Sequence, residues 1–210
     1  IADVFALPDI RTGSFRLLIT LRNDTDAPTR GTLEAVIGSA TAETATIEAT
    51  WKHMLVAKPG DSVYETTLRL PQPRLWELDA PHLYRLTVSL DSFSGGAQQA
   101  APLRHVYSLR CGLRELRVER GHFRLNGRRT FLRSTHTCNN YPLGQHMPIL
   151  ADHLRRDLLH AKEAGFNCVR FIAGVAWPEQ LDFCDEIGLM VYEECQASWC
   201  LGDSPRMGAL

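Results

Sequence analysis

The stretch AGFNCVRFIAGVAWPEQLDFCDEIGLMVYEEC, residues 164–195, decides how the C-terminal half of the chain folds. Its short apolar runs NCVRFI and LMVYEE have the composition of buried strands. The segment between them contains Pro178, which suits the first position of a helix, and reaches Gly188, which suits the position after its last turn. The sequence therefore predicts a strand, a helix and a second strand.

Another helix is predicted just upstream, in MPILADHLRRDLLHAKEAGF, residues 147–166. Its apolar residues recur at helical spacing: Leu150, Leu154, Leu158 and Ala161. Pro148 lies near the expected first turn, and Gly165 fits the position just past the end. Strands that alternate with helices through tight returns form parallel sheets, so the fold is either a doubly wound sheet or a (β/α)8 barrel. No glycine-rich loop follows the strands, which disfavours a nucleotide-binding fold.

Residues 1 to about 108 follow a different period. In SFRLLITLRND, residues 14–24, one face carries Phe15, Leu17, Ile19 and Leu21. Such alternation is typical of half-buried antiparallel strands. About seven short strands in roughly 105 residues predict an immunoglobulin-like β-sandwich. The whole chain is therefore expected to be multidomain, with a β-sandwich followed by an α/β part.

Two further segments are a connection within the predicted sandwich and a strand pair that follows it. LPQPRLWELDAPHLY, residues 70–84, contains three prolines and is expected to form an extended connection between strands. We interpret Trp76 and Tyr84 as packed aromatic side chains rather than as ligand platforms. LRVERGHFRLNGRRTFLRS, residues 116–134, predicts a strand pair with turns at Arg-Gly and Asn-Gly.

The composition excludes several classes of partner and compartment. A net charge of -1 argues against nucleic acid and anionic membranes, and no apolar run approaches the ~20 residues of a membrane span. The six cysteines include no C-x-x-C pair, so we expect reduced thiols rather than a disulfide framework. The opening residues IADVFALPDIRTG show neither a signal peptide nor an initiator methionine. We expect a cytoplasmic protein whose natural N-terminus is missing.

Three motifs occur in order along the chain. They are PRLWELDAPHLYRLTVSL at 73–90, GHFRLNGRRTFLRSTH at 121–136, and AGFNCVR at 164–170 with FCDEIGLMVYEE at 183–194. Together they resemble glycoside hydrolase family 2, the family of β-galactosidases, β-glucuronidases and β-mannosidases. The first is similar to the end of that family's sandwich domain, the second to the entry into barrel strand one, and the third to strands two and three.

The resemblance implies an architecture in which this chain is incomplete. The family combines a jelly-roll sugar-binding domain, an immunoglobulin-like domain and a (β/α)8 barrel. Residues 1–110 would correspond to the immunoglobulin-like domain, and residues 111–210 to the N-terminal part of the barrel with its first three strands. A complete barrel needs about 250 residues. In the family, the acid/base lies at the end of strand four and the nucleophile at the end of strand seven. Both positions would fall beyond Leu210, so this chain is expected to hold no catalytic residue.

The implied chemistry is retaining hydrolysis of β-linked glycosides, in which two carboxyl groups about 5 Å apart act on one bond. Glu193 and Glu194 are not expected to be that pair, because adjacent strand residues point to opposite faces. Glu194 is expected either to face the pocket and bind substrate, or to accept hydrogen bonds from Arg170 or Arg133. An arginine within a strand must be paired. We therefore interpret Arg170, with Arg133, as orienting the site from behind, with a purely structural ion pair or a substrate contact as alternatives for Arg170.

The other substrate-binding candidates lie in loops that follow the strands. They are His136, Asn139, Trp177 and Trp199. Aromatic faces stack on sugar rings, although a tryptophan at a helix start can equally cover the core. The family's β-galactosidases carry a glutamate after strand one and a histidine after the strand-two arginine, and both are absent here. A lactose-type galactosidase specificity is therefore not favoured.

No metal or cofactor is predicted. Some family members bind a metal through E-x-H after strand three, where this chain has Ser198 and Cys200, so no magnesium is expected there. His136 and Cys138, with Cys195 and Cys200, form a zinc alternative whose spacing matches no common zinc module. The proposed hydrolysis also needs no redox cofactor.

The sequence thus predicts part of a retaining glycoside hydrolase with a carbohydrate substrate, and predicts that the chain alone is inactive. The alternatives are a non-catalytic module that binds carbohydrate or protein, and a pseudoenzyme. Three parallel strands leave an unpaired edge and exposed apolar surface, so self-association through the open barrel edge is expected.

Overall fold

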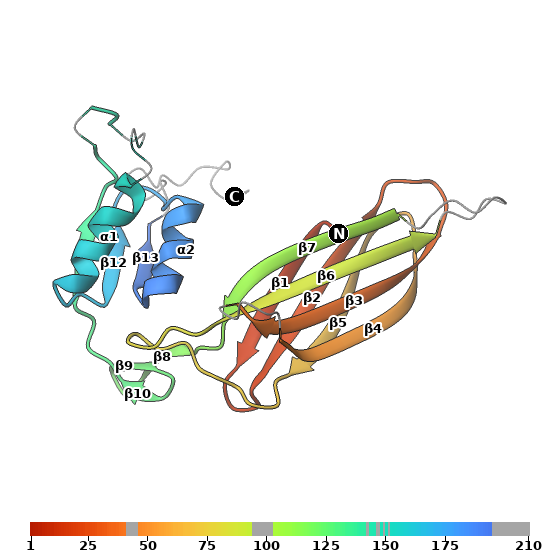
Figure 1. Cartoon of the computed structure of the whole chain (residues 1–210), viewed down its shortest axis with the longest axis horizontal. Helices are drawn as coiled ribbons and strands as arrows, with labels where there is room; N and C mark the ends of the chain where they lie inside the picture. Colours follow the sequence, from red (N-terminus) through yellow and green to blue (C-terminus); the bar gives the residue numbers. More distant parts are fainter. Residues whose placement is uncertain are drawn as a thin grey trace, which may run out of the picture. The chain divides into compact units, whose positions relative to one another are not determined.

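The computed structural model describes residues 1–40, 46–93, 103–141, 143–145, 148, 150 and 152–194. They fall into two compact units (Figure 1). The first unit comprises Ile1–Glu77 and His82–Arg129, and the second comprises Leu78–Pro81 and Thr130–Leu210. The first holds the antiparallel strands that the period-two alternation predicts, and the second holds the predicted series of strands and helices.

The first unit is a sandwich of two antiparallel sheets. Their strand orders are β1-β2-β5 and β4-β3-β6-β7. The bounds are β1 Asp3–Asp9, β2 Ser14–Asn23, β3 Thr29–Ser39, β4 Ile47–Ala57, β5 Gly60–Arg69, β6 Leu83–Phe93 and β7 Leu103–Gly112. The seven strands agree with the predicted number. Because neighbours such as β2 and β5 are far apart in sequence, the chain crosses between the sheets.

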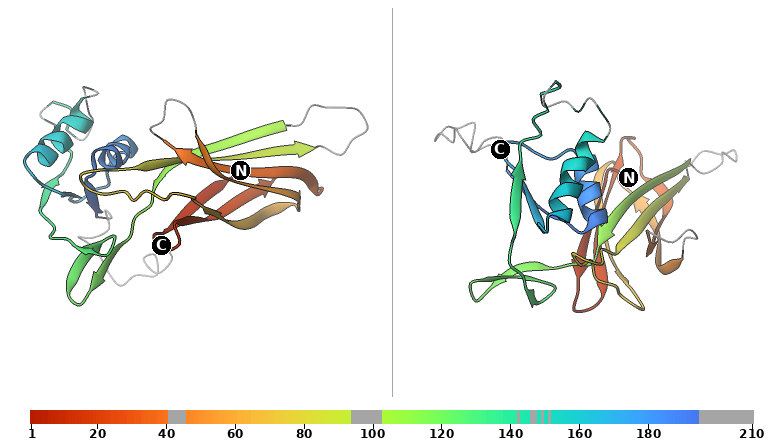
Figure 2. Two further views of the ribbon diagram at one scale, coloured as in Figure 1. Left: turned by 60° about the horizontal axis from the view of Figure 1, so that its bottom comes forward. Right: turned by 60° about the vertical axis from the view of Figure 1, so that its left-hand side comes forward.

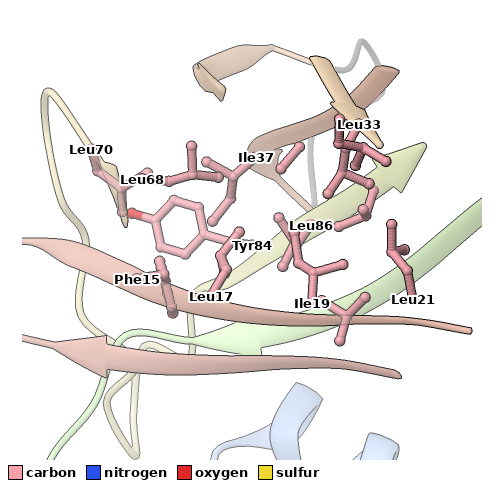
Figure 3. Packing of buried hydrophobic residues seen from close by; sticks show 14 of the residues in the cluster. Phe15, Leu17, Ile19, Leu21, Leu33, Ile37, Leu68, Leu70, Tyr84 and Leu86 are labelled. Carbon is pink, nitrogen blue, oxygen red and sulfur yellow. The ribbon is translucent and has the colours of Figure 1, made fainter. Parts of the chain in front are cut away.

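Alternate residues of these strands fill the space between the two sheets. On β2, Phe15, Leu17 and Ile19 are fully buried, as the period-two pattern predicts. Figure 3 shows them facing the opposite sheet, where Ile37 of β3 and Leu86 of β6 lie. Burying a side chain of this size stabilises the fold by roughly 1.5–3 kcal/mol relative to exposing it. This cluster is therefore the main apolar core of the first unit.

The two aromatic residues of the proline-containing connection belong to the interior, as predicted. Tyr84 is fully buried, and its hydroxyl accepts a hydrogen bond of 2.7 Å from the backbone N–H of Arg74. Trp76 is also fully buried, with the guanidinium of Arg114 4.4 Å from the centre of its ring. Neither ring is available as a ligand platform.

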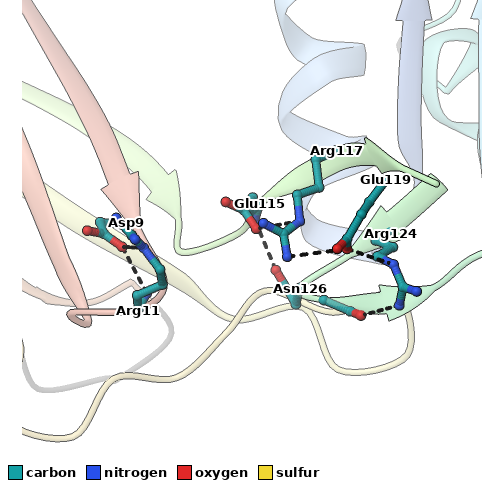
Figure 4. Close-up of polar contacts among 8 residues, drawn as sticks. Asp9, Arg11, Glu115, Arg117, Glu119, Arg124 and Asn126 are labelled. Carbon is teal, nitrogen blue, oxygen red and sulfur yellow. Dashed lines mark hydrogen bonds and ion pairs between the residues drawn. The ribbon is translucent and has the colours of Figure 1, made fainter. Parts of the chain in front are cut away.

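Residues after β7 form a three-stranded sheet, where the sequence predicted only a strand pair. The strands are β8 Leu116–Glu119, β9 His122–Leu125 and β10 Arg128–Arg129. Positive φ angles at 120–121 and 126–127 confirm both predicted turns. The side chain of Asn126 accepts the backbone N–H of Glu115 at 3.0 Å (Figure 4). It also donates to the carbonyl of Trp76 at 2.9 Å. These bonds fix the second turn, and the chain leaving it pairs again with β9.

The second unit is a parallel sheet with both helices on one side. The order β11-β12-β13 is parallel throughout. The bounds are β11 Ser134–Thr137, α1 His153–Glu163, β12 Cys168–Phe171, α2 Pro178–Ile187 and β13 Met190–Glu193. Val169 and Phe171 pack with Leu158 of α1 and Cys184 of α2. The right-hand view of Figure 2 shows both helices on the same side of the strands.

The helix α1 begins later than predicted. It starts at His153, so Pro148 lies outside it, and Leu150 is 58% exposed. A strand of four residues spans only about 13 Å, which a helix of eleven residues already exceeds. An additional N-terminal turn would have no sheet to pack against. Leu150 therefore does not join the helix, although its spacing from Leu154 fits a helical face. Among the described residues, neither helix is long and apolar enough to cross a membrane.

The helix α2 agrees with its prediction at both ends. Pro178 is its first residue, and Gly188 follows it in the left-handed region with φ of 71°. That conformation favours glycine, because other residues meet a steric penalty there. Gly165, after α1, has φ of 87° for the same purpose. These returns bring the carboxyl ends of β11, β12 and β13 to one edge of the sheet.

Candidate functional site

The polar face of the second unit's sheet is the one that the helices leave uncovered. His136 of β11 lies opposite Arg170 of β12, which lies opposite Tyr192 of β13. Side chains at matching positions of parallel strands share a face, and they alternate with the residues that pack on the helices. His136 and Tyr192 are exposed, and Arg170 is partly buried. An imidazole, a guanidinium and a phenol therefore form a row across the sheet.

Arg170 is paired with Glu194, as one of the predicted alternatives requires. Its Nε donates to the Oε1 of Glu194 at 2.6 Å, and its Nη2 contacts the same oxygen. The guanidinium carbon also lies 5.8 Å from the centre of the Tyr192 ring. The charge of Arg170 is thus compensated from two directions, by a carboxylate and by an aromatic face.

Glu194 also holds the loop that follows β12. Its Oε2 accepts the backbone N–H of Ala173 at 3.0 Å. This hydrogen bond, followed by the one from Arg170, lowers the pKa of Glu194 below its ordinary value of 4.5. Ala173 has φ of 56°, a left-handed conformation that costs energy for a residue with a Cβ atom. The carboxylate of Glu194 stabilises that turn.

Glu193 binds the far end of the same loop. Its Oε1 accepts the backbone N–H of Ala176 at 2.7 Å. Glu193 shares its sheet face with Phe171, which packs against the helices, whereas Glu194 reaches Arg170 on the other face. The two glutamates therefore point to opposite sides, and each is engaged by backbone N–H groups of the loop.

Asn139 lies in the loop after β11 and is bound to Gln180 of α2. The Nδ2 of Asn139 donates to the Oε1 of Gln180, and the Nε2 of Gln180 donates to the Oδ1 of Asn139, both at 2.9 Å. Both side chains are buried. The hydroxyl of Tyr141 also donates to the Oδ1 of Asn139 at 3.4 Å. The amide oxygen of Asn139 thus accepts two hydrogen bonds from within the protein.

A pocket of about 660 Å³ lies at the carboxyl ends of β11 and β12. The loops after these strands line it, and Trp177 and Pro178 at the start of α2 close one side. Trp177 is partly buried. A smaller cavity of about 370 Å³ lies between β11 and α1 and is lined by His136 among others. The larger pocket has the size and the mixed lining of a small-ligand site.

The structure brings together only some of the predicted site residues. Asn139 and Trp177 line the larger pocket, whereas Arg170 and Glu194 form a pair at the ends of the next two strands. Arg133 lies at the amino end of β11, where its Nε donates to the carbonyl of Gly165 at 2.8 Å. It is therefore not among the residues gathered at the carboxyl ends.

The structure describes only some of the residues that the metal predictions concern. Trp199, Ser198, Cys195 and Cys200 lie outside the described residues, so their predictions stay predictions. Within the described ranges, no group of three or more His, Cys, Asp and Glu side chains could hold a metal ion. His136 and Cys138 belong to that searched part.

The sequence-based reasoning missed Gln180 and the backbone of Ala173. Gln180 is 2% exposed and occupies the inward face of α2, four residues before the buried Cys184. A glutamine at an apolar helix position was a detectable signal, because a buried amide needs partners. No comparable signal marks Ala173, since nothing in the sequence shows that an alanine would adopt a positive φ.

Comparison with known proteins relates the chain to a family. The family model described as "Glycosyl hydrolases family 2" matches residues 1–104. The chain belongs to glycosyl hydrolases family 2. Within the family, it is 27% identical over 197 residues to a beta-galactosidase of Alteromonas mediterranea, which covers 92% of this chain and 18% of the relative. A beta-galactosidase of Vibrio vulnificus is 31% identical over 136 residues, or 64% of this chain and 12% of that protein.

Solved structures of this family share the fold. A member from Bacteroides cellulosilyticus matches with a TM-score of 0.76 and 20% identity over 91% of this chain and 26% of its own. A beta-galacturonidase from Eisenbergiella tayi, bound to galacturonate, matches with a TM-score of 0.75 and 25% identity over 93% of this chain and 33% of its own. The family 2 chain described here thus spans about a third or less of the proteins that it resembles.

Proposed function

We propose that this chain is part of a retaining glycoside hydrolase that acts on β-linked glycosides. The observation that carries the proposal is the Arg170–Glu194 pair beside a pocket at the carboxyl ends of parallel strands, in a chain of family 2. The carboxyl ends of parallel strands are where α/β folds place their chemistry.

In this proposal residues 1–110 are an immunoglobulin-like domain, and residues 111–210 are the start of a (β/α)8 barrel. Three parallel strands with both helices on one face support it, because barrel helices lie outside and the other face turns inward. The row of His136, Arg170 and Tyr192 would then face the barrel interior.

The catalytic carboxyl groups are proposed to lie outside this chain. Retention requires an acid/base and a nucleophile about 5 Å apart on the two sides of one glycosidic bond. Glu193 and Glu194 diverge, and both accept hydrogen bonds from the same loop. Their arrangement supports a role in shaping the pocket rather than in attack on a sugar.

We assign the substrate contacts to residues around the pocket mouth. His136 would donate or accept hydrogen bonds with sugar hydroxyls, and Trp177 would pack on the sugar ring. Glu194 would accept further hydrogen bonds from sugar hydroxyls, in addition to those from Arg170 and Ala173. Asn139 contributes to the pocket wall. Arg170 holds Glu194 in place, Arg133 binds the carbonyl of Gly165 at the other end of β11, and Trp199 lies outside the described residues. The proposed partner is a carbohydrate substrate, and the proposed location of the protein is the cytoplasm. The proposed hydrolysis needs no cofactor.

The test is hydrolysis of aryl β-glycosides by the purified chain and by the longer reading frame that contains it. We expect no turnover by the 210-residue chain above a heat-treated control, and retention of anomeric configuration by the longer protein, read by proton NMR. Turnover by the chain alone would contradict the proposal that the catalytic carboxyl groups lie outside it. An inverted product would contradict the mechanism, and an inactive longer protein would favour the non-catalytic module or the pseudoenzyme.

A further inference from the structure

A pair of amide side chains connects the loop after β11 to α2. Asn139 and Gln180 exchange two hydrogen bonds of 2.9 Å, in which each side chain is both donor and acceptor. Their exposed fractions are 8% and 2%. A reciprocal amide pair is satisfied only in one relative orientation, so it fixes the loop more narrowly than apolar packing would.

Gln180 extends this connection to the first turn of α2. Its Oε1 also accepts the backbone N–H of Trp177, the residue before the helix, at 3.1 Å. A side chain at the third helical position that binds the N-cap backbone is one half of a capping box. One oxygen of Gln180 thus holds Asn139 and Trp177 at the same time.

The backbone at Asn139 favours this residue type. Its φ is 53°, in the left-handed region where asparagine is among the few tolerated residues other than glycine. Its N–H donates to the Oγ1 of Thr137 at 3.2 Å, and its Oδ1 also receives the Tyr141 hydroxyl. The loop is therefore held at four points that converge on Asn139.

The pair also lies where it determines the shape of both cavities. Asn139 lines the pocket of about 660 Å³ as well as the cavity of about 370 Å³, and Gln180 lines the smaller one. Trp177, which Gln180 holds, lines the larger pocket. Separation of the pair would therefore change the lining of both cavities, because Asn139 lines each of them and Gln180 holds the Trp177 backbone.

We propose that Asn139 and Gln180 act together as positioning residues, and that their amide pair sets the binding shape of the pocket at the carboxyl ends of β11 and β12. The role of the pocket in sugar binding rests on the proposed function, whereas the positioning itself does not. Asn139 would thus serve the site through Gln180 rather than as a direct ligand, because its amide oxygen is occupied by two donors.

The test uses Gln180→Glu, which replaces the amide by a group that can be switched by pH. The ionised carboxylate keeps both acceptors but cannot donate to the Oδ1 of Asn139, whereas the protonated acid can. Hydrogen exchange of residues 138–141 and of the Trp177 amide is measured by mass spectrometry near pH 8 and near pH 4, as protection relative to intrinsic rates. The exposed neighbour Glu179, changed to Gln, is the matched control, and peptides from β2 report whether the chain remains folded.

At the higher pH we expect the protection of residues 138–141 in Gln180→Glu to fall at least about tenfold, and at the lower pH to return to within about threefold of the unmodified chain. Glu179→Gln should stay near the unmodified chain at both. Unchanged protection at both pH values would overturn the proposal. An equal loss at both would also overturn it, because the side chain would then matter only for folding.

Asn139→Asp provides a second variant if Gln180→Glu does not fold. It removes the other donor of the pair and should show the same recovery on protonation; a loss that is independent of pH would contradict the pairing. Methyl β-galactoside, β-glucuronide and β-galacturonide are then titrated into the variants and into the unmodified chain. At the higher pH we expect the variants to bind the sugars about tenfold more weakly than the unmodified chain does. If the unmodified chain binds none of them while the exchange results hold, the sugar site fails and the positioning inference stands.

Discussion

At the scale of single residues, Glu194 links the pocket loop to the sheet. It binds Arg170 with one oxygen and the N–H of Ala173 with the other. Both contacts favour the ionised carboxylate, which is why the pKa of Glu194 is lowered. The stability of the loop should therefore depend on pH through this residue.

The lowered pKa predicts a specific acid sensitivity. Because the folded-state pKa lies below the ordinary value of 4.5, Glu194 contributes stability that is complete above that value and is lost as pH falls through the lowered pKa. The variant Glu194→Gln should melt at a lower temperature than the unmodified chain at pH 7. Circular dichroism melts from pH 7 to pH 2 should show the difference shrinking below pH 4.5. A difference that does not change with pH would contradict the ion pair.

At the scale of elements, the turns and helix ends were the most predictable features. Pro178, Gly188, Gly165 and the Asn126–Gly127 turn all appear where the sequence places them, because their backbone requirements are local. The start of α1 was not predictable, since it depends on the length of the strands that the helix covers. The third strand β10 depends likewise on where the chain goes after its turn.

The site was predictable only in its broad position. Because adjacent strand residues point to opposite faces, the sequence predicts that Glu193 and Glu194 diverge, and the structure shows Glu194 on the face of Arg170. Contacts between loops do not follow from any periodicity. The partnership of Asn139 with Gln180, forty-one positions away, needs the three-dimensional structure.

A close backbone approach in the sandwich gives a prediction for the element scale. At Gly38 the pairing of β3 with β4 shifts register, and an added Cβ atom would lie 1.9 Å from the carbonyl oxygen of Thr46. Gly38→Ala should therefore destabilise the sandwich by about 3 kcal/mol, the upper end of the usual cost of overpacking.

Gly60 is the control for this substitution. It has φ of 86°, but an added Cβ atom would meet nothing within 4 Å. Gly60→Ala should cost only about 1–2 kcal/mol, the penalty of the left-handed conformation. Urea unfolding followed by tryptophan fluorescence measures both. Equal losses in the two variants would show that contact with Thr46 is not the cause.

At the scale of the whole molecule, the parallel sheet has two strands at its edges. Within the described residues, β11 and β13 each pair on one side only, and β11 borders the cavity beside α1. Unpaired edges of this kind bind other strands. We expect the purified chain to form dimers or larger species at concentrations of tens of micromolar, seen as a concentration-dependent sedimentation coefficient. A monomer throughout the accessible range would contradict an open edge.

The central claim is that the pocket at the carboxyl ends of β11 and β12 receives a sugar. A titration of the isotope-labelled chain with methyl β-glycosides, followed in nitrogen–proton correlation spectra, tests it most directly. We predict saturable shifts in residues 138–140 and 173–177. The dissociation constant should lie in the millimolar range, because the catalytic carboxyl groups are proposed to lie outside the chain. Shifts confined to the sandwich, or none at saturating sugar, would contradict the assignment of this pocket.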